Sequence, residues 1–127
     1  MNSSAHPDLH ALTQAVQRAA QQSPAQRTGL RIQGAGTHDF YGESLQGEVL
    51  TTRGLAGIGS YEPSELVVTV GAGTSLQELE ACLAEQGQAL AFEPPHFGPG
   101  ATVGGMVAAG LSGPAWALCV TMCWALA

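Results

Sequence analysis

Lysine is absent from this sequence of 127 residues, and four arginines are its only permanently basic side chains. Ten acidic residues oppose them and set the formal net charge at −6. Proteins that bind nucleic acid bring a basic surface to the phosphate backbone, so this charge balance excludes that class. The missing lysine also excludes the Walker phosphate loop, which needs Gly-Lys-Ser/Thr. A phosphate group on this chain would have to be held mainly by backbone N–H groups.

Cysteine is scarce, and a leader segment is not recognisable. The three cysteines, Cys82, Cys119 and Cys123, do not have the spacing of zinc ligands, so we expect reduced thiols. His6 and His10 are four residues apart with no third ligand nearby, which favours exposed helix residues over a metal site. The first residues lack the basic start and apolar run of a signal peptide, and we expect a cytoplasmic protein.

Hydrophobic periodicity predicts helices and strands in alternation. Residues 8–21 repeat apolar side chains at helical spacing. Ser75 and Glu78 form a capping box at the start of a second helix, and Gly87 is placed to end it. The predicted strands are residues 30–33, 48–52, 65–70 and 89–92, with a glycine-broken stretch at 54–60 and a loop at 98–105 that leads into the small-residue segment 106–113.

Glycine is abundant at the ends of the predicted strands. The dense stretches are Gly34-x-Gly36, Gly71-x-Gly73 and residues 98–105. One such pair usually marks only a tight turn, but glycine also lets a ligand approach the backbone closely. A Rossmann fingerprint needs a third glycine three positions after the second, and Asp39 and Leu76 stand there instead. Classical NAD and ATP folds are therefore poor interpretations, and a different phosphate cradle remains open.

The order and spacing of several motifs resemble the FAD-binding domain of the vanillyl-alcohol-oxidase type, also called the PCMH-type domain. The resemblance covers roughly residues 5–115. Within this family the chain is most similar to the FAD-binding subunits of bacterial glycolate oxidases. The motifs that carry it are Arg-Ile-Gln-Gly-Ala-Gly-Thr-His-Asp-Phe-Tyr-Gly at 31–42, Tyr-Glu-Pro at 61–63, Val-Val-Thr-Val-Gly-Ala-Gly-Thr at 67–74, Phe-Glu-Pro-Pro at 92–95, and Pro-Gly-Ala-Thr-Val-Gly-Gly-Met-Val-Ala-Ala-Gly at 99–110.

The resemblance implies an α+β fold: an N-terminal α/β subdomain and the start of the second subdomain of such a domain. It also implies that FAD is the cofactor and that two segments hold it. The first segment, residues 34–38, would cradle the pyrophosphate, and the second would line its other side, while the turn at 71–73 positions its helix. The implied cofactor-binding residues are Gly34, Ala35, Gly36, Thr37, His38, Pro99, Thr102, Val103, Gly104, Gly105, Ala108, Ala109 and Gly110. No catalytic residue and no metal ligand can be named.

The function implied by the resemblance is the oxidation of a 2-hydroxy acid, glycolate, to its 2-oxo acid. A second flavoprotein subunit and an iron–sulfur subunit would be the partners, and membrane association would come only through them. Two alternatives stay open: another oxidase of the superfamily, acting on lactate, a sugar lactone or an alcohol, and an inactive fragment that serves as a binding or assembly module. His38 is further expected either to lie beside the phosphates or to carry a covalent flavin link, as a histidine of this loop does in some relatives.

Residues 116–127 depart from the family pattern. Methionine and tryptophan have single codons, so much of the DNA behind this tail is fixed. In a shifted frame, residues 122–125 encode Val-Leu-Gly, and the preceding codons permit Val-Gly-Ala-Val-Arg-Asp-Tyr, as relatives have there. We therefore expect a frameshift near Ala115 and Trp116, and a truncated chain that is inactive alone. The uncharged stretch 103–127 is long enough to cross a bilayer, but Gly104-Gly105 and Gly113-Pro114 interrupt it, and we expect no transmembrane segment.

Overall fold

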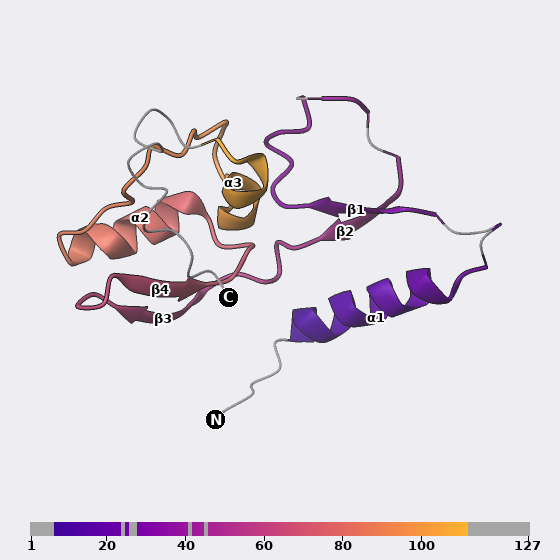
Figure 1. Ribbon diagram of the computed structural model, residues 1–127, viewed down its shortest axis with the longest axis horizontal. Helices are drawn as coiled ribbons and strands as arrows, with labels where there is room; N and C mark the ends of the chain where they lie inside the picture. The colour runs from indigo at the N-terminus through magenta and orange to yellow at the C-terminus, as the bar shows by residue number, and fades with distance from the viewer. Residues whose placement is uncertain (1–6, 24, 26–27, 41, 45, 112–127) are drawn as a thin grey trace.

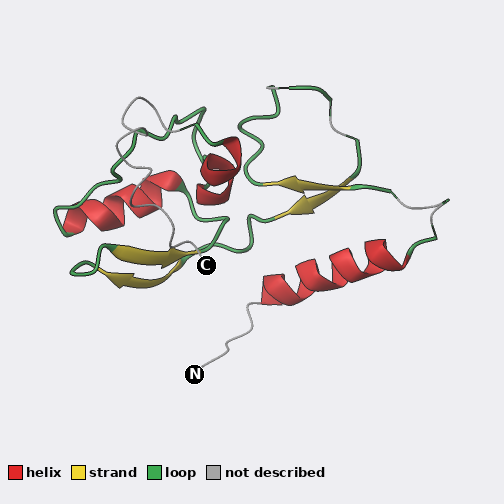
Figure 2. Ribbon diagram, viewed as in Figure 1, coloured by secondary structure: helices red, strands yellow, loops and turns green. Residues whose placement is uncertain are grey.

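The computed structural model describes residues 7–23, 25, 28–40, 42–44 and 46–111. The predicted frameshifted tail, 116–127, lies outside these residues. Figures 1 and 2 show the described elements as helices and short two-stranded sheets. In chain order these are α1 (Pro7–Gln21), β1 (Leu30–Gln33), β2 (Glu48–Thr51), β3 (Ile58–Glu62), β4 (Val67–Val70), α2 (Leu76–Glu85) and α3 (Val103–Ala109). The expected α+β class is confirmed.

Strands β1 and β2 form a parallel pair that carries the first glycine-rich loop. Leu30 lies opposite Glu48 and Gln33 lies opposite Thr51. Their connection contains residues 34–47, so the predicted pyrophosphate loop leaves the sheet directly at the end of β1. Apolar side chains of this pair are open to solvent, with Ile32 at 72% exposure. The pair therefore presents the loop without itself forming a core.

Strands β3 and β4 form an antiparallel hairpin. Strand β3 was not predicted, because Gly57 and Gly59 make the stretch 54–60 look like a break in regular structure. Pairing with β4 overrides that weak local preference. Strand β4 begins at Val67 and not at Glu65, since residues 63–66 form the turn and Leu66 adopts a left-handed φ of 57°.

The core lies between this hairpin, α2 and α3. The Ser75 hydroxyl accepts a hydrogen bond from the Glu78 N–H at 3.1 Å, which confirms the predicted helix start. The apolar stripe of α2 is buried at Leu76, Leu79 and Leu83, and its Cys82 is a half-buried free thiol. The buried apolar residues are Leu76, Leu79, Leu83, Ala101 and Val103, with Tyr61, Val68, Val70, Leu90 and Met106 packed against them. Figure 1 shows α2 lying alongside the β3–β4 hairpin.

Two predictions from the sequence were wrong, and part of the apolar stripe of α1 is exposed to solvent. Residues 89–92 form no strand, since they take part in no backbone–backbone hydrogen bond within the described ranges. Helix α3 begins inside the predicted loop at Val103, where the buried Thr102 side chain caps it. Helix α1 forms as predicted, yet Leu9 and Val16 of its apolar stripe are 52% and 46% exposed. No helix in the described ranges is long and apolar enough to cross a membrane.

Candidate functional site

The first glycine-rich loop, residues 34–38, is held in shape by the side chain of Asp39. Its carboxylate accepts a hydrogen bond from Gln33 Nε2 at 2.6 Å and pairs with Arg31 Nη2 at 2.8 Å. Both partners lie on β1, so the loop is folded back toward the strand that it leaves. Gly36 makes this possible with a φ of +74°, which a residue with a side chain rarely adopts. The Arg31 guanidinium is thereby committed to Asp39.

The backbone N–H groups of residues 34–38 donate to no other group in the part of the chain that the structure describes. All of these residues are half-buried. Successive free N–H groups in a glycine-rich turn are the arrangement that binds phosphate without a lysine. The geometry therefore suits the pyrophosphate-binding role that the family resemblance predicts for this loop.

The second expected segment lies against the first. A Cβ atom on Gly34 would stand 2.6 Å from Thr102 Oγ1, and one on Gly98 would stand 3.9 Å from Thr37 Cγ2. The His38 ring meets the Phe97 ring edge-on with centroids 4.6 Å apart, and Phe40 lies 5.8 Å from the same ring. Two glycine-rich stretches more than 60 residues apart in sequence thus form one surface.

One ring nitrogen of His38 has no hydrogen-bond partner in the part of the chain that the structure describes. Its Nδ1 lies 3.3 Å from Thr37 Oγ1, whereas its Nε2 is buried and has no hydrogen-bond partner among the described residues. A buried nitrogen without a partner costs free energy unless another group satisfies it. His38 therefore has capacity for a hydrogen bond to a group outside the protein.

The second segment uses its own N–H groups internally. Val103 and Gly104 donate to the Thr74 and Ala72 carbonyls, both at 2.9 Å, and Gly105 donates to Thr102 Oγ1 at 3.2 Å. The Val103 side chain is part of the core. The expected members Pro99, Ala108, Ala109 and Gly110 are exposed. This segment can line a cofactor with small surfaces, but its N–H groups at 103–105 are already occupied.

Close packing explains why glycine stands at positions 71, 73 and 104. A Cβ atom on Gly104 would stand 2.9 Å from the Ala72 Cβ. On Gly71 or Gly73 it would overlap carbonyl oxygens of the turn between β2 and β3, those of Leu55 and Thr52. These contacts support the expectation that the 71–73 turn positions α2, and they bring α3 close to that turn.

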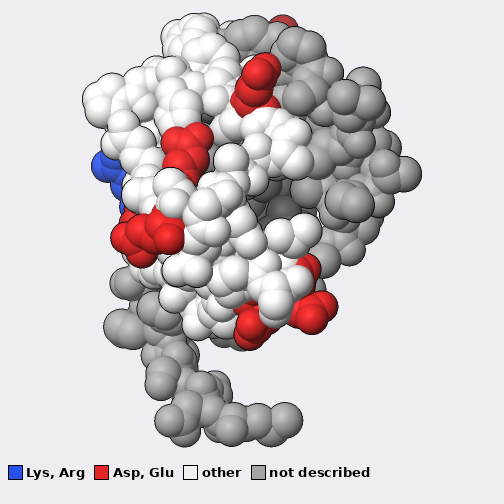
Figure 3. Space-filling model, turned by 90° about the vertical axis from the view of Figure 1, so that its left-hand side faces the viewer, with Lys and Arg blue, Asp and Glu red and all other residues white. Residues whose placement is uncertain are grey.

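The electrostatic surroundings offer little positive charge. After Arg53 the described chain contains no arginine or lysine, and its acidic residues are Glu62, Glu65, Glu78, Glu80, Glu85 and Glu93. Figure 3 shows several separate acidic patches on one face, with a basic group only at its edge. Backbone N–H groups are thus the main available partners for an anion.

The described residues contain no group of three or more side chains that could hold a metal ion. His10 is exposed on α1, and His6 lies outside the described residues. The features that fit a flavin dinucleotide are instead the N–H groups of residues 34–38 and the buried Nε2 of His38, none of which has a partner among the described residues.

Some contributors to this surface were not identified from the sequence. Phe97 had no expected role, although it contacts both His38 and Phe40. The clamp of Asp39 by Arg31 and Gln33 was also missed. The alternation of Arg31 and Gln33 on one strand, six to eight residues before an acidic residue, was a usable signal for that clamp.

Comparison with known proteins indicates the family of the chain. A family model described as the FAD binding domain matches residues 11–123. Glycolate oxidase subunit GlcE of Escherichia coli (strain K12) is 45% identical over 102 residues, which cover 80% of this chain and 29% of that relative. No solved structure matches the chain.

The match spans well over half of the chain, so it decides the family and not only a motif. It also confirms FAD as the cofactor that the sequence predicted. The chain spans less than a third of the length of the curated relative that it matches. This chain belongs to the FAD binding domain family of oxidoreductases.

Proposed function

We propose that residues 5–115 are the first part of the FAD-binding domain of a glycolate-oxidising flavoprotein subunit. The observation that carries the proposal is the contact between the loop at 34–38, with its free N–H groups, and the segment at 98–105. The loop would bind the pyrophosphate, and the exposed small residues at 108–110 would line the dinucleotide beyond it. When bound, FAD supplies the redox chemistry, and the protein supplies binding and orientation.

The reaction that we propose is the oxidation of a 2-hydroxy acid to a 2-oxo acid, with glycolate as the substrate. The support is the 45% identity to a subunit named for glycolate oxidase. Substrate contacts would come from the part of such a subunit beyond the aligned 102 residues, so we expect the 127-residue chain to be inactive alone. The same name indicates partner chains, and we propose a second flavoprotein subunit and an iron–sulfur subunit in the cytoplasm.

Cofactor binding is tested by titrating the purified chain with FAD and following the quenching of flavin fluorescence. Saturable quenching supports the proposal. A protein that stays colourless and leaves FAD fluorescence unchanged would favour the alternative of a binding or assembly module without a flavin.

Substrate choice is tested with the full-length subunit assembled with its partner chains. Anaerobic addition of glycolate should bleach the visible flavin band faster than lactate, a sugar lactone or a simple alcohol does. Faster bleaching by one of the other compounds would assign the protein to a different oxidase of the superfamily.

His38 is proposed to contact the cofactor, because its buried Nε2 has no partner within the described chain. Acid precipitation of FAD-loaded protein separates the two forms of that contact. Yellow colour in the supernatant shows a noncovalent flavin, whereas colour that stays in the pellet shows the covalent link.

A further inference from the structure

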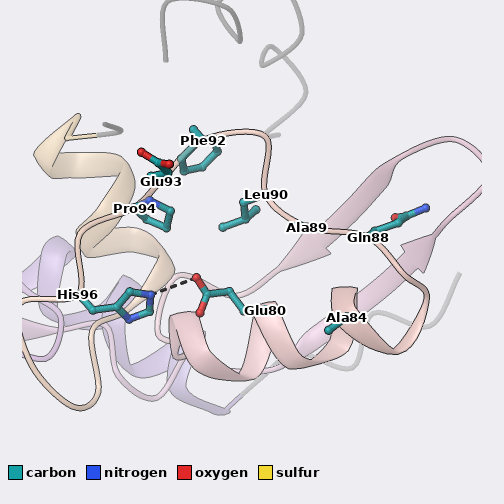
Figure 4. A pocket seen from close by; sticks show the side chains of 9 residues that line it. All are labelled: Glu80, Ala84, Gln88, Ala89, Leu90, Phe92, Glu93, Pro94 and His96. Atoms are coloured by element: carbon teal, nitrogen blue, oxygen red, sulfur yellow. Dashed lines mark hydrogen bonds and ion pairs between the residues drawn. The ribbon is translucent and has the colours of Figure 1, made fainter. Parts of the chain in front are cut away.

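The chain between α2 and the second glycine-rich segment crosses a cavity. Residues 89–97 have no regular secondary structure and take part in no backbone–backbone hydrogen bond within the described ranges. A cavity of about 400 Å³ separates this segment from α2, lined on one side by Glu80 and Ala84 and on the other by Leu90, Phe92 and Pro94. Figure 4 shows the segment arching over the helix. Its position therefore depends on contacts at its two ends and on Leu90, which packs against the core.

The first end is fixed by Gln88. Its Oε1 accepts a hydrogen bond from the Tyr61 hydroxyl at 2.5 Å, and its Nε2 donates to the Pro63 carbonyl at 2.8 Å. Burial and, to a smaller extent, the nearby Cys82 raise the pKa of Tyr61 above its ordinary value of 10.0, so the phenol remains a donor at neutral pH. This end is anchored to the β3–β4 hairpin.

The second end is fixed by His96. Its Nε2 lies 3.0 Å from Glu80 Oε1 of α2, and both side chains are a little more than one-third exposed. Figure 4 shows the two side chains pointing toward each other. Among the side chains that line the cavity, Glu93 is the other charged group. The contact ties the end of the segment at 89–97 to helix α2.

The residue after His96 reaches the cofactor loop. Phe97 meets the His38 ring at 4.6 Å and the Phe40 ring at 5.8 Å, and Gly98 follows beside Thr37. A shift of His96 would therefore move the aromatic ring that covers His38. No other described ring contacts His38.

We propose that Glu80 and His96 are positioning residues for the flavin site: their contact holds Phe97 against His38 and so sets the shape of the loop at 34–38. The proposal rests on the function proposed above. It assigns a role in cofactor binding to a residue of helix α2 that is more than 40 residues from the loop in sequence.

The experiment compares Glu80→Ala, Glu80→Gln and the matched control Glu85→Ala, which changes an exposed glutamate of the same helix. The first readout uses no cofactor: it is the NMR shift of the His38 ring protons in the chain labelled at histidine. Phe97→Leu removes the ring and defines the His38 shift without the aromatic neighbour. The second readout is the dissociation constant for FAD.

We expect Glu80→Ala to move the His38 signals toward those of Phe97→Leu and to weaken FAD binding about two- to fivefold, the range that a partly exposed pair supports. Glu80→Gln keeps an acceptor for His96 and should restore both readouts, and Glu85→Ala should change neither. Unchanged His38 signals in Glu80→Ala would overturn the inference.

The two readouts separate the proposals. If the wild-type chain fails to bind FAD while the His38 signals respond as expected, the positioning contact stands and the proposed function fails. Equal loss of FAD binding in Glu80→Ala and Glu85→Ala, with no difference at His38, would reduce Glu80 to a general effect on helix α2 and would also overturn the inference.

Discussion

Gly34 marks the closest approach between the two segments that form the cofactor surface. A Cβ atom there would stand 2.6 Å from Thr102 Oγ1, and that hydroxyl cannot turn away without losing its hydrogen bond to the Gly105 N–H at the start of α3. The contact between the two segments therefore needs a residue without a side chain at Gly34. A substitution should affect both stability and FAD binding.

Gly34→Ala should lower the free energy of unfolding by about 1–3 kcal/mol, as overpacking typically does. It should also weaken FAD binding, because the two segments must separate. Denaturant unfolding and FAD titration measure the two effects. Gly29→Ala is the control, since nothing lies within 4 Å of a Cβ atom there and its φ is ordinary. Equal behaviour of the two variants would contradict the close contact.

Leu66 has a backbone conformation that its side chain disfavours. It is 72% exposed and adopts a φ of 57° in the turn between β3 and β4. Asparagine adopts that conformation more readily, so Leu66→Asn should raise the free energy of unfolding by up to about 1 kcal/mol. Thermal unfolding monitored by circular dichroism measures the change. Leu66→Ala keeps the strained backbone and should give no gain; a gain equal to that of asparagine would contradict the argument.

At the scale of elements, the apolar stripes of α1 and α2 differ in how far they are buried. Leu79 of α2 is 2% exposed within the core, whereas Leu9 of α1 is 52% exposed. The same substitution at the two positions therefore tests where the stability of the chain lies. Leucine in a close-packed core is costly to truncate because a cavity remains.

Leu79→Ala should lower the free energy of unfolding by about 2–5 kcal/mol. Leu9→Ala should change it by less than about 0.5 kcal/mol, as exposed substitutions usually do. Urea unfolding of both variants makes the comparison. A large loss at Leu9 would show that α1 packs against the core in solution.

The sequence predicts elements well where local chemistry decides them. The capping pair of Ser75 and Glu78 and the β-branched run at Val67–Val70 act locally, and both predicted elements formed. Strand β3 was missed because Gly57 and Gly59 weaken the local signal, while its pairing with β4 is a tertiary effect. The predicted strand at 89–92 did not form, since no backbone hydrogen bond pairs it within the described ranges.

The site was predictable in its segments but not in its contacts. Glycine spacing and family resemblance indicated the stretches at 34–38 and 98–110. Neither could show that Phe97 covers His38, because that contact joins residues far apart in sequence. The pairing of the N–H groups at 103–105 likewise depends on the turn before α2, and no local pattern encodes it.

At the scale of the whole molecule, the net charge of the chain and the charge of the FAD pyrophosphate have the same sign. The chain carries a formal charge of −6, and the pyrophosphate of FAD is also anionic. Proteins that hold phosphates with basic side chains lose affinity as salt rises, since the attraction is screened. Here the long-range interaction is repulsive, and salt screens a repulsion.

The affinity for FAD should therefore stay level or rise, by about twofold or less, between low and high salt. Isothermal titration at several sodium chloride concentrations, with a matched potassium acetate series to separate specific ion effects, measures it. A steep loss of affinity with salt would show that arginine side chains, and not N–H groups, hold the pyrophosphate.

The origin of residues 116–127 is also a question about the whole molecule, and the frameshift stays a prediction. Sequencing the DNA downstream of the codon for Ala115 should reveal one frame that encodes Val-Leu-Gly and then continues the family pattern. RNA sequencing of the same region controls for an error in the genomic read. If no frame continues the pattern, the tail is not a frameshift product.

The N–H groups at 103–105 are hydrogen-bonded within the protein, whereas those at 34–38 have no partner among the described residues. The free-energy cost of cofactor binding therefore differs between the two segments. In residues 103–105 the N–H groups are already withdrawn from water and held in place by the fold before a cofactor binds. The loop at 34–38 must give up its hydrating water and its remaining freedom when the cofactor arrives. Variation at 102–105 would therefore be selected chiefly through how much folded protein a cell contains, and variation at 34–38 through how much of that protein carries flavin.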